Sequence, residues 1–326
     1  MNTQSEPQSL PETETESPLD ISLVIPLFNE EESLRPLTQK IRDTMDMDGR
    51  SFEVIFIDDG STDGSMAVLE ELHAAHPEVK VIQFRRNFGK AAGYTVGFQK
   101  AIGTFVITMD ADLQDDPDEI PSLIAKLDEG YDLVSGWKKK RFDPLGKTLP
   151  SKFFNWVTGR VSGVPIHDFN CGLKAYRNEV VKDIRVYGEL HRYIPVLAHM
   201  EGYRVSEIPV KHHPRQFGVT KYGWGRLMKG FLDLLTVMFL GRFMARPLHL
   251  FGTMGVVLGT LGMGINLFIV SLWFQTGTIQ NRHPLLILGV LMSVLGVLFI
   301  CTGLLADMIA RSSLPNEKFN IQRTLE

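Results

Sequence analysis

The sequence predicts an α/β domain with a mostly parallel sheet, followed by an interfacial amphipathic helix and two transmembrane helices. Short apolar runs alternate with helical segments from residue 20 to residue 136, a pattern typical of doubly wound sheets with right-handed crossovers. Most of these runs end in polar or acidic residues, at the strand ends where such sheets bind ligands. Two long apolar blocks, 248–273 and 285–306, contain no charged residue, and each is long enough to cross a bilayer.

The individual elements follow from apolar runs and from the residues that bound them. Asn29 is a natural N-cap for the first helix, and the acidic residues after it favour a helix start. No Gly-x-Gly-x-x-Gly follows the first strand, and no phosphate-loop sequence occurs, which argues against dinucleotide-dependent oxidoreductases and NTPases. We expect strands at 21–28, 52–57, 79–84, 104–109, 132–136 and 203–210, and helices at 31–46, 65–75, 90–102 and 118–128.

Composition limits the function further. The 326-residue chain has a net charge of −4, which argues against a nucleic-acid binder that relies on bulk electrostatics. Its two cysteines are Cys171 and Cys301, and the second lies in an apolar block, so a reducing compartment is expected rather than a disulfide framework. Residues 1–19 are polar and acidic without the features of a signal peptide, and we expect a disordered tail.

The strand at 104–109 leads into the acidic sequence Asp110-Ala-Asp112, with Gln114 close behind. If the strand bends at its end, the two carboxylates converge on one cation and Gln114 adds a neutral oxygen. Hard oxygen donors of this kind suit Mg²⁺ or Mn²⁺, which can also hold a diphosphate. The alternative is a solvated acidic turn.

Three later segments leave alternatives open. The basic run 138–141 precedes an aromatic segment at 153–157, which suits either a solvated face or a site near anionic lipid. Asp168 lies in a polar turn, where a capping role is the simplest interpretation. The loop 211–223 carries basic residues and glycines, as expected for a flap that holds phosphates, and its two histidines lack the spacing of a metal site.

The C-terminal part predicts membrane association. Residues 224–246 form an amphipathic pattern fringed by basic residues, favouring an interfacial helix over a buried core helix. The two apolar blocks reach roughly 39 and 33 Å at about 1.5 Å per residue, against a bilayer core of about 30 Å. Basic residues flank the hairpin on the side of the termini, so both termini and the α/β domain are expected in the cytoplasm. Five glycines predict close helix packing, namely Gly252, Gly255, Gly259, Gly262 and Gly264.

Four segments together resemble a known family. They are Ile25-Pro-Leu-Phe-Asn-Glu30, Asp58-Asp-Gly-Ser-Thr-Asp-Gly64, Arg86-Asn-Phe-Gly-Lys90 and Met109-Asp-Ala-Asp-Leu-Gln-Asp-Asp-Pro117. With the two C-terminal spans, the chain is similar to family 2 glycosyltransferases of the GT-A fold, in particular the polyprenyl-phosphate glycosyltransferases of bactoprenol glucosyltransferase type, which are related to dolichol-phosphate mannose synthase. The resemblance covers residues 20 to about 310.

The resemblance implies roles for individual residues. The nucleotide-sugar would be bound by Pro26, Phe28, Glu30, Asp58, Asp59, Lys90, Asp110 and Ala111. Asp110, Asp112 and Gln114 would ligate Mg²⁺ or Mn²⁺, and Asp168 would lie near the sugar and the acceptor. Arg215 and Lys221 would hold the diphosphate and the lipid phosphate. Leu173 and Lys174 depart from the phenylalanine and arginine of the family pattern.

The implied reaction is an inverting transfer of a sugar, most simply glucose, from a UDP-sugar to polyprenyl (undecaprenyl) phosphate at the cytoplasmic membrane face. Mannose, an N-acetylhexosamine or an aminoarabinose derivative are alternative sugars. A processive polysaccharide synthase would need more spans and a Gln-x-x-Arg-Trp sequence that is absent, and a non-catalytic scaffold would not need the intact acidic segment. A homo-oligomer through the membrane segments, such as a tetramer, is expected.

The expected domain organisation follows. It is a tail at 1–19, a GT-A catalytic domain at 20–223, a juxtamembrane helix at 224–246, two spans within 247–308, and a cytoplasmic tail at 309–326.

Overall fold

The computed structural model describes residues 19–139, 155–160, 162–184, 186, 190–214, 247–279 and 281–312. The chain separates into two compact units, Met1–Gly223 and Trp224–Glu326. Several expectations lie outside the described residues: residues 1–18 of the tail, the helix at 224–246, residues 313–326, and the flap residues Arg215 and Lys221.

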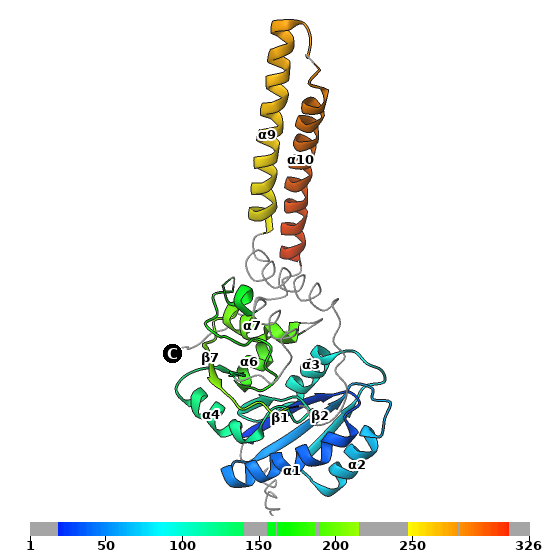
Figure 1. Cartoon of the computed structure of the whole chain (residues 1–326), viewed down its shortest axis with the longest axis vertical. Helices are drawn as coiled ribbons and strands as arrows, with labels where there is room; N and C mark the ends of the chain where they lie inside the picture. The colour runs from blue at the N-terminus through cyan, green and yellow to red at the C-terminus, as the bar shows by residue number, and fades with distance from the viewer. Residues whose placement is uncertain are drawn as a thin grey trace, which may run out of the picture. The chain divides into compact units, whose positions relative to one another are not determined.

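The first unit is built on one seven-stranded sheet (Figure 1). The strand order is β3-β2-β1-β4-β6-β5-β7, and all neighbours pair in parallel except at β6, which is antiparallel to both β4 and β5. The strands are β1 (Ile21–Leu27), β2 (Phe52–Asp58), β3 (Val79–Gln83), β4 (Phe105–Thr108), β5 (Leu133–Trp137), β6 (Lys174–Arg177) and β7 (Val205–Pro209). The predicted fold class, an α/β domain with a mostly parallel sheet, is therefore confirmed, and β6 is the antiparallel strand within it.

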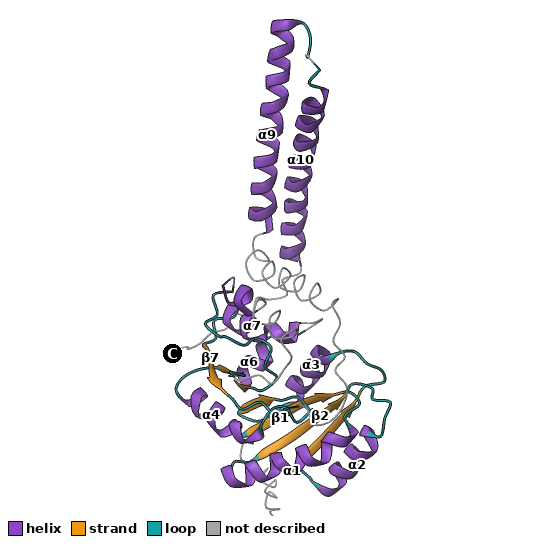
Figure 2. Cartoon of the chain, in the orientation of Figure 1, coloured by secondary structure: helices purple, strands orange, loops and turns teal. Residues whose placement is uncertain are grey.

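Helices cover both faces of this sheet (Figure 2). They are α1 (Glu31–Asp48), α2 (Ser65–Ala75), α3 (Lys90–Lys100), α4 (Ile120–Asp128), α6 (Asn178–Asp183) and α7 (Ile194–Met200), with short 3₁₀ turns η1 (Pro117–Glu119) and η2 (Leu190–Tyr193). Buried residues of α1, α2 and α4 join one apolar core with the strands, including Leu37, Leu69 and Leu123. The other face receives α3, where Gly93 and Gly97 let the helix approach Pro26 and Val24 of β1 closely.

Asn29 does not cap α1. Its backbone is left-handed, with φ at 57°, and its side-chain Oδ1 accepts a hydrogen bond from the amide of Thr62 at 2.8 Å. Glu30 occupies the N-cap position without a side-chain capping bond. The prediction of an Asn29 cap is wrong because the loop after β2 lies beside this turn and engages the side chain first.

The second unit contains two long helices, α9 (Pro247–Thr276) and α10 (His283–Ser312). Both are long and apolar enough to cross a membrane, and few of their side chains are buried. The glycines expected to pack closely do so only in part. A Cβ on Gly255 or Gly262 would lie 2.5–2.6 Å from backbone atoms of α10, whereas one on Gly264 would meet nothing.

Candidate active site

The end of β2 places two buried carboxylates at the sheet edge. Asp58 accepts hydrogen bonds from the amide of Ser61 at 2.9 Å and from the side chain of Gln83 at 3.1 Å. Asp59 accepts from the amides of Phe88 and Gly89, at 2.7 and 2.9 Å. Both carboxylates are therefore engaged with neutral donors, and Asp59 holds the loop that leads into α3.

The other residues expected at the nucleotide lie close to this edge. Pro26 is in β1 and packs against Gly93 of α3. Phe28 follows β1 and is half-buried. The amide of Glu30 donates to Ser65 Oγ at 3.0 Å, and a Glu30 carboxylate oxygen accepts from Ser33 Oγ at 3.3 Å. Topology thus brings them to the same end of adjacent strands as Asp58 and Asp59.

Asp110 and Asp112 follow β4, the strand next to β1 on its other side. Ala111 between them is buried, and Leu113 adopts a left-handed backbone with φ at 58°. This bend lets Asp112 Oδ1 accept from the amide of Gln114 at 3.2 Å. The chain therefore turns sharply here, as the proposed convergence of carboxylates requires.

Lys90, the first residue of α3, forms an ion pair with Asp110. Burial alone would raise the pKa of Asp110, but the ammonium groups of Lys90 and Lys138 outweigh that effect and hold this pKa well below its usual range. Asp110 is therefore ionised at neutral pH. Because Asp59 binds the amide of Gly89, the residue before Lys90, the start of α3 connects the end of β2 with the end of β4.

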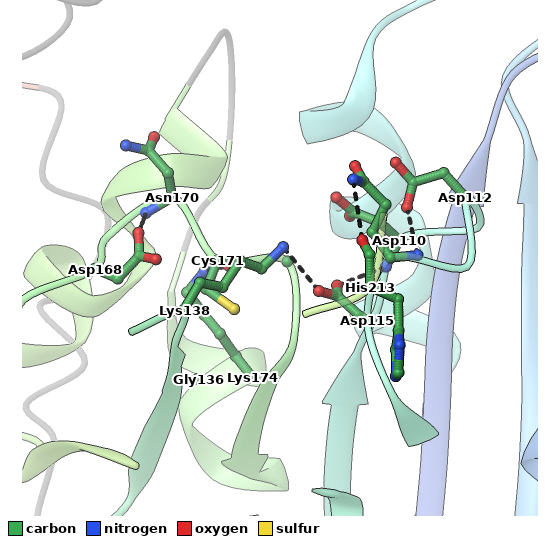
Figure 3. Close-up of polar contacts among 12 residues, drawn as sticks. Asp110, Asp112, Asp115, Gly136, Lys138, Asp168, Asn170, Cys171, Lys174 and His213 are labelled. Carbon is green, nitrogen blue, oxygen red and sulfur yellow. Dashed lines mark hydrogen bonds and ion pairs between the residues drawn. The ribbon is translucent and has the colours of Figure 1, made fainter. Parts of the chain in front are cut away.

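A second ion pair joins Lys138 and Asp115, and both residues are labelled in Figure 3. Lys138, just after β5, contacts the carboxylate of Asp115 at 2.8 Å, and their side chains are 13% and 0% exposed. Asp115 also accepts from the amide of Asp110 at 3.5 Å. Burial would lower the pKa of Lys138, yet Asp115 and its neighbours raise it above the usual value. Lys138 is thus a buried cation of the site rather than part of a solvated basic face.

The first residues of the expected flap lie against the acidic segment. The amide of His213 donates to the carbonyl of Gln114 at 2.9 Å, and His213 Nε2 lies 2.9 Å from Asp116 Oδ2. The Gln114 side chain donates to the His213 carbonyl at 3.4 Å. The described start of this loop, which precedes Arg215 and Lys221 in the sequence, therefore contacts the acidic segment that follows β4.

Asp168 is 1% exposed and lies in the turn before β6. Its Oδ1 accepts from the amide of Asn170 at 3.1 Å and from Asn155 Nδ2 at 3.5 Å. These are the contacts of a turn that also holds a helical segment, residues 155–160, through Asn155. Asp168 still lies near the charged cluster, since its carbonyl accepts a hydrogen bond at 3.3 Å from Ser135 Oγ, and Ser135 pairs with Lys174.

Strand β6 brings Lys174 to the same sheet edge. Because β6 is antiparallel, its first residue pairs with Thr108 at the end of β4 and with Ser135 in β5. The preceding Gly172 lies against Asp110, where an added Cβ would be 2.5 Å from the carboxylate. Neighbouring Cys171 is a buried thiol whose pKa burial raises to about 12, so it is not a nucleophile at neutral pH.

The structure thus brings the predicted nucleotide and metal residues to one edge of the sheet, whereas the flap residues Arg215 and Lys221 lie outside the described part. Lys138, Lys174 and Asp115 lie at the same edge and were not identified as site residues from the sequence. For Lys138 the basic run was the available signal, but it does not show which lysine points inward.

Among the described residues, no three His, Cys, Asp or Glu side chains form a group able to hold a metal ion alone. Asp110 and Asp112 nevertheless supply two hard carboxylates at a bent strand end, with Gln114 beside them. Mg²⁺ commonly binds through one or two carboxylates and completes its shell with water and substrate phosphates. The donor set fits a divalent ion carried with a diphosphate, and does not fit a permanent all-protein cage.

Comparison with known proteins agrees with this geometry. Residues 22–185 match the family model described as glycosyl transferase family 2. The chain is 40% identical over 299 residues to a dodecaprenyl-phosphate galacturonate synthase of Rhizobium johnstonii, covering 90% of this chain and 88% of the relative. It is 36% identical over 293 residues to an undecaprenyl-phosphate 4-deoxy-4-formamido-L-arabinose transferase of Klebsiella pneumoniae, with 89% and 88% covered.

Solved structures share the fold at low sequence identity. A glucosyl-3-phosphoglycerate synthase of Mycobacterium tuberculosis, in complex with Mn²⁺, UDP and phosphoglyceric acid, has a TM-score of 0.52 at 16% identity, covering 68% of this chain and 78% of that one. A mannosyltransferase of Pyrobaculum calidifontis, in complex with GDP-Man and Mn²⁺, has a TM-score of 0.50 at 18% identity, covering 95% and 80%. The family model and the relatives confirm the resemblance seen in the sequence: the chain belongs to glycosyl transferase family 2 and is a glycosyltransferase.

Proposed function

We propose that this enzyme transfers a sugar from a UDP-sugar to polyprenyl phosphate, with inversion at the anomeric carbon, at the cytoplasmic face of a membrane. The observation that carries the proposal is the 40% identity to a dodecaprenyl-phosphate galacturonate synthase, which extends over nine tenths of the chain and so includes both compact units. A lipid acceptor would also explain the apolar helices α9 and α10, because such a substrate stays in the bilayer.

The donor would lie along the edge formed by the ends of β2 and β4. We assign the base and ribose to Pro26, Phe28, Glu30, Asp58 and Asp59, and the diphosphate to the metal ligands. A Mg²⁺ or Mn²⁺ ion held by Asp110, Asp112 and Gln114 would supply Lewis-acid stabilisation of the charge on the departing UDP. The Mn²⁺ and UDP in the glucosyl-3-phosphoglycerate synthase structure support this assignment.

Basic side chains of the protein would stabilise the remaining negative charge on the phosphates. Lys90 is held beside Asp110, where its ammonium can donate to phosphate oxygens. Ammonium groups fixed before the reaction stabilise developing charge without reorganising. Arg215 and Lys221, which follow directly from the segment that contacts Gln114, would grip the diphosphate and the lipid phosphate.

The acceptor needs little activation. A phosphate monoester has a second pKa near 6, so the phosphate group is largely a dianion at neutral pH. One of its oxygens can therefore attack the anomeric carbon without a strong general base. Asp168, whose carboxylate is fixed by Asn155 and Asn170, would then position the sugar or the acceptor. A single displacement converts an α-linked UDP-sugar into a β-linked polyprenyl phosphate.

The membrane arrangement is part of the proposal. Arg242 and Arg246 precede α9, and Arg311 lies at the end of α10, while the connecting loop has only Arg282. The positive-inside rule then places the loop outside and the catalytic unit in the cytoplasm. Association of copies through these helices, for instance as a tetramer, belongs to the same proposal.

For the sugar, the sequence resemblance favours glucose. The names of the two relatives add galacturonate and a formamido-arabinose as further candidates. These differ in charge and in ring substituents, so the donor panel must contain neutral, acidic and amino-substituted sugars.

The test uses full-length protein in lipid nanodiscs with undecaprenyl phosphate and Mg²⁺. Each nucleotide sugar of the panel is added separately, and the lipid fraction is analysed by mass spectrometry. We expect a polyprenyl-phosphate sugar with one donor and the release of UDP in equal amount. Absence of a lipid-linked product with every donor would refute the proposed function.

A further inference from the structure

The buried ammonium of Lys174 has no ion-pair partner among the residues that the structure describes. Lys174 is 4% exposed at the start of β6, and among the described residues its ammonium donates only to the backbone carbonyl of Cys171. It forms no ion pair with any described carboxylate. Buried charges in proteins are ordinarily paired, so this arrangement calls for an explanation.

Lys182 shows how the same fold satisfies a structural lysine. Its ammonium donates to three carbonyls at the C-terminal end of α3, those of Phe98, Gln99 and Ala101, at 2.6, 3.0 and 2.8 Å. Since an ammonium has three N–H donors, Lys182 is fully used. Lys174 uses one donor in the described part of the chain and keeps two for another partner.

The carboxylates at this edge of the sheet already have other contacts. Asp110 is paired with Lys90, and Asp115 is paired with Lys138. Asp168 accepts hydrogen bonds in its own turn from the amide of Asn170. Burial lowers the pKa of Lys174, although Cys171, Asp168 and Asp110 act in the opposite direction. The ammonium therefore lies beside the reaction site with spare hydrogen-bonding capacity.

His191 gives a second, independent indication. It lies in η2 against Tyr94 of α3, with ring centroids 6.4 Å apart. Its Nδ1 is buried and has no hydrogen-bond partner in the described structure. Burial, followed by the charges of Lys90, Arg192 and Lys174, lowers the pKa of His191 to about 2, so the ring is neutral. The same Tyr94 ring lies 5.5 Å from the ammonium of Lys90, whose partner Asp110 packs against Gly172 just before Lys174. The imidazole nitrogen without a partner therefore belongs to the same part of the site as Lys174.

The position of these groups along the sheet edge indicates what they bind. The strand order places β2, with the proposed base and ribose residues, on one side of β4, and β6 with Lys174 on the other. Asp110 and Asp112 lie between them. A substrate group at Lys174 is therefore beyond the diphosphate, where the sugar and the attacking phosphate meet.

We infer that Lys174 and His191 form an oxyanion subsite that binds a negatively charged oxygen group of a substrate. This group is either the phosphate of the acceptor lipid or a carboxylate on the donor sugar. The inference rests on the proposed function, since it assigns two further residues to that reaction. Lys174 supplies two charge-assisted hydrogen bonds to the anion, and the neutral ring of His191 adds one donor without adding charge.

The test compares steady-state kinetics of full-length Lys174→Met, Lys174→Arg and His191→Phe in nanodiscs. Undecaprenyl phosphate is varied at saturating donor, and UDP-galacturonic acid and UDP-galactose are varied at saturating acceptor. For Lys174→Met we expect a rise of about 10- to 100-fold in one KM, as for loss of a charge-assisted hydrogen bond, with partial rescue in Lys174→Arg. His191→Phe keeps the ring contact with Tyr94 and should raise the same KM by about fivefold.

The affected KM identifies the anion. A rise for undecaprenyl phosphate with either donor assigns the subsite to the acceptor phosphate, whereas a rise confined to UDP-galacturonic acid assigns it to a sugar carboxylate. Lys182→Met is the matched control, which should lower thermal stability and leave every KM unchanged. If Lys174→Met does not fold, His191→Phe decides with the same readout.

Failure of the inference differs from failure of the proposed function. An active wild-type enzyme whose variants at Lys174 and His191 keep all KM values overturns the subsite alone. A wild-type enzyme that makes no lipid-linked product from any donor overturns the proposed function and the subsite with it.

Discussion

The carboxylates at the end of β2 and those after β4 have different kinds of partners, although both groups lie at the same edge of the sheet. At the end of β2, Asp58 and Asp59 accept hydrogen bonds from backbone amides and a glutamine side chain. At the ends of β4 and β5, Asp110 and Asp115 are instead paired with Lys90 and Lys138. The carboxylates at the end of β2 are thus held by uncharged donors, whereas those after β4 belong to a network of ion pairs.

This difference suggests separate roles for the two groups of carboxylates in binding the donor. Under the proposed function, the neutral donors would fix the loops beside the uncharged base and ribose, and the closely spaced opposite charges would rearrange around a metal and phosphates. Asp59 and Lys90 connect the two groups, because Asp59 binds the amide just before Lys90. The predictions below test whether the ion-paired group carries the chemistry and the group with uncharged donors carries the shape.

The largest effect is expected for Asp112→Asn. Its Oδ1 accepts from the amide of Gln114, and an amide oxygen can keep that contact, so folding should be unaffected. Loss of one metal-binding carboxylate should lower kcat by about 10³-fold, measured as lipid-linked product. Asp43→Asn, a change on the exposed face of α1, is the matched control and should retain full activity. Wild-type activity in Asp112→Asn would remove the metal role.

Lys138→Met should cause the largest loss of stability. It leaves the carboxylate of Asp115, which is 0% exposed, without its cation. Breaking a buried pair from one side costs about 3–5 kcal/mol, which urea unfolding of the catalytic unit within the full-length protein would detect. A loss of unfolding free energy below about 1 kcal/mol would show that the Lys138–Asp115 pair is solvated. The two groups of carboxylates would then differ less than described above.

Asp59→Asn should have a smaller effect on stability than Lys138→Met. The amide keeps one acceptor oxygen but loses the second, which now receives the amide of Gly89. Replacing one charge-assisted bond costs about 1–2 kcal/mol, and KM for the UDP-sugar should rise because the start of α3 loosens. Unchanged stability together with a large fall in kcat would instead assign Asp59 to the chemistry.

Gly172→Ala tests the packing of β6 against the acidic segment. A Cβ there would lie 2.5 Å from the Asp110 carboxylate, so the side chain must move while the backbone stays. We expect about a tenfold lower kcat/KM, roughly 1.4 kcal/mol, with little change in melting temperature. Gly159→Ala, whose added Cβ would meet no atom closer than 3.7 Å, serves as control. Equal activity of the two variants would contradict the close approach.

Much of the fold was predictable from local pattern. Helix α2 has the bounds expected from the sequence, and strands β1 to β5 differ by one residue or so at their ends, because apolar runs and their polar boundaries are local signals. The antiparallel β6 was not predictable in this way. It has four residues and begins with a buried lysine, which is the opposite of the apolar pattern that marks a central strand.

The site was predictable to the extent that topology determines it. Asp58, Asp59, Asp110 and Asp112 follow parallel strands that end at one edge, so their neighbourhood follows from strand order. Lys138 and Lys174 join them only through the pairing of β5 with β6, a long-range contact without a local signal. The prediction that Asn29 caps α1 was wrong for the same reason, because the amide of Thr62, which binds the Asn29 side chain, lies in a different loop.

The central claim is that the end of β4 holds a metal and the diphosphate of a nucleotide. The most direct measurement is UDP binding by isothermal titration calorimetry with full-length protein in nanodiscs, with Mn²⁺ and with EDTA. We predict clear binding with Mn²⁺, at least tenfold weaker binding with EDTA, and the same loss in Asp112→Asn with Mn²⁺ present. UDP affinity that is unchanged by EDTA and by Asp112→Asn would contradict the account.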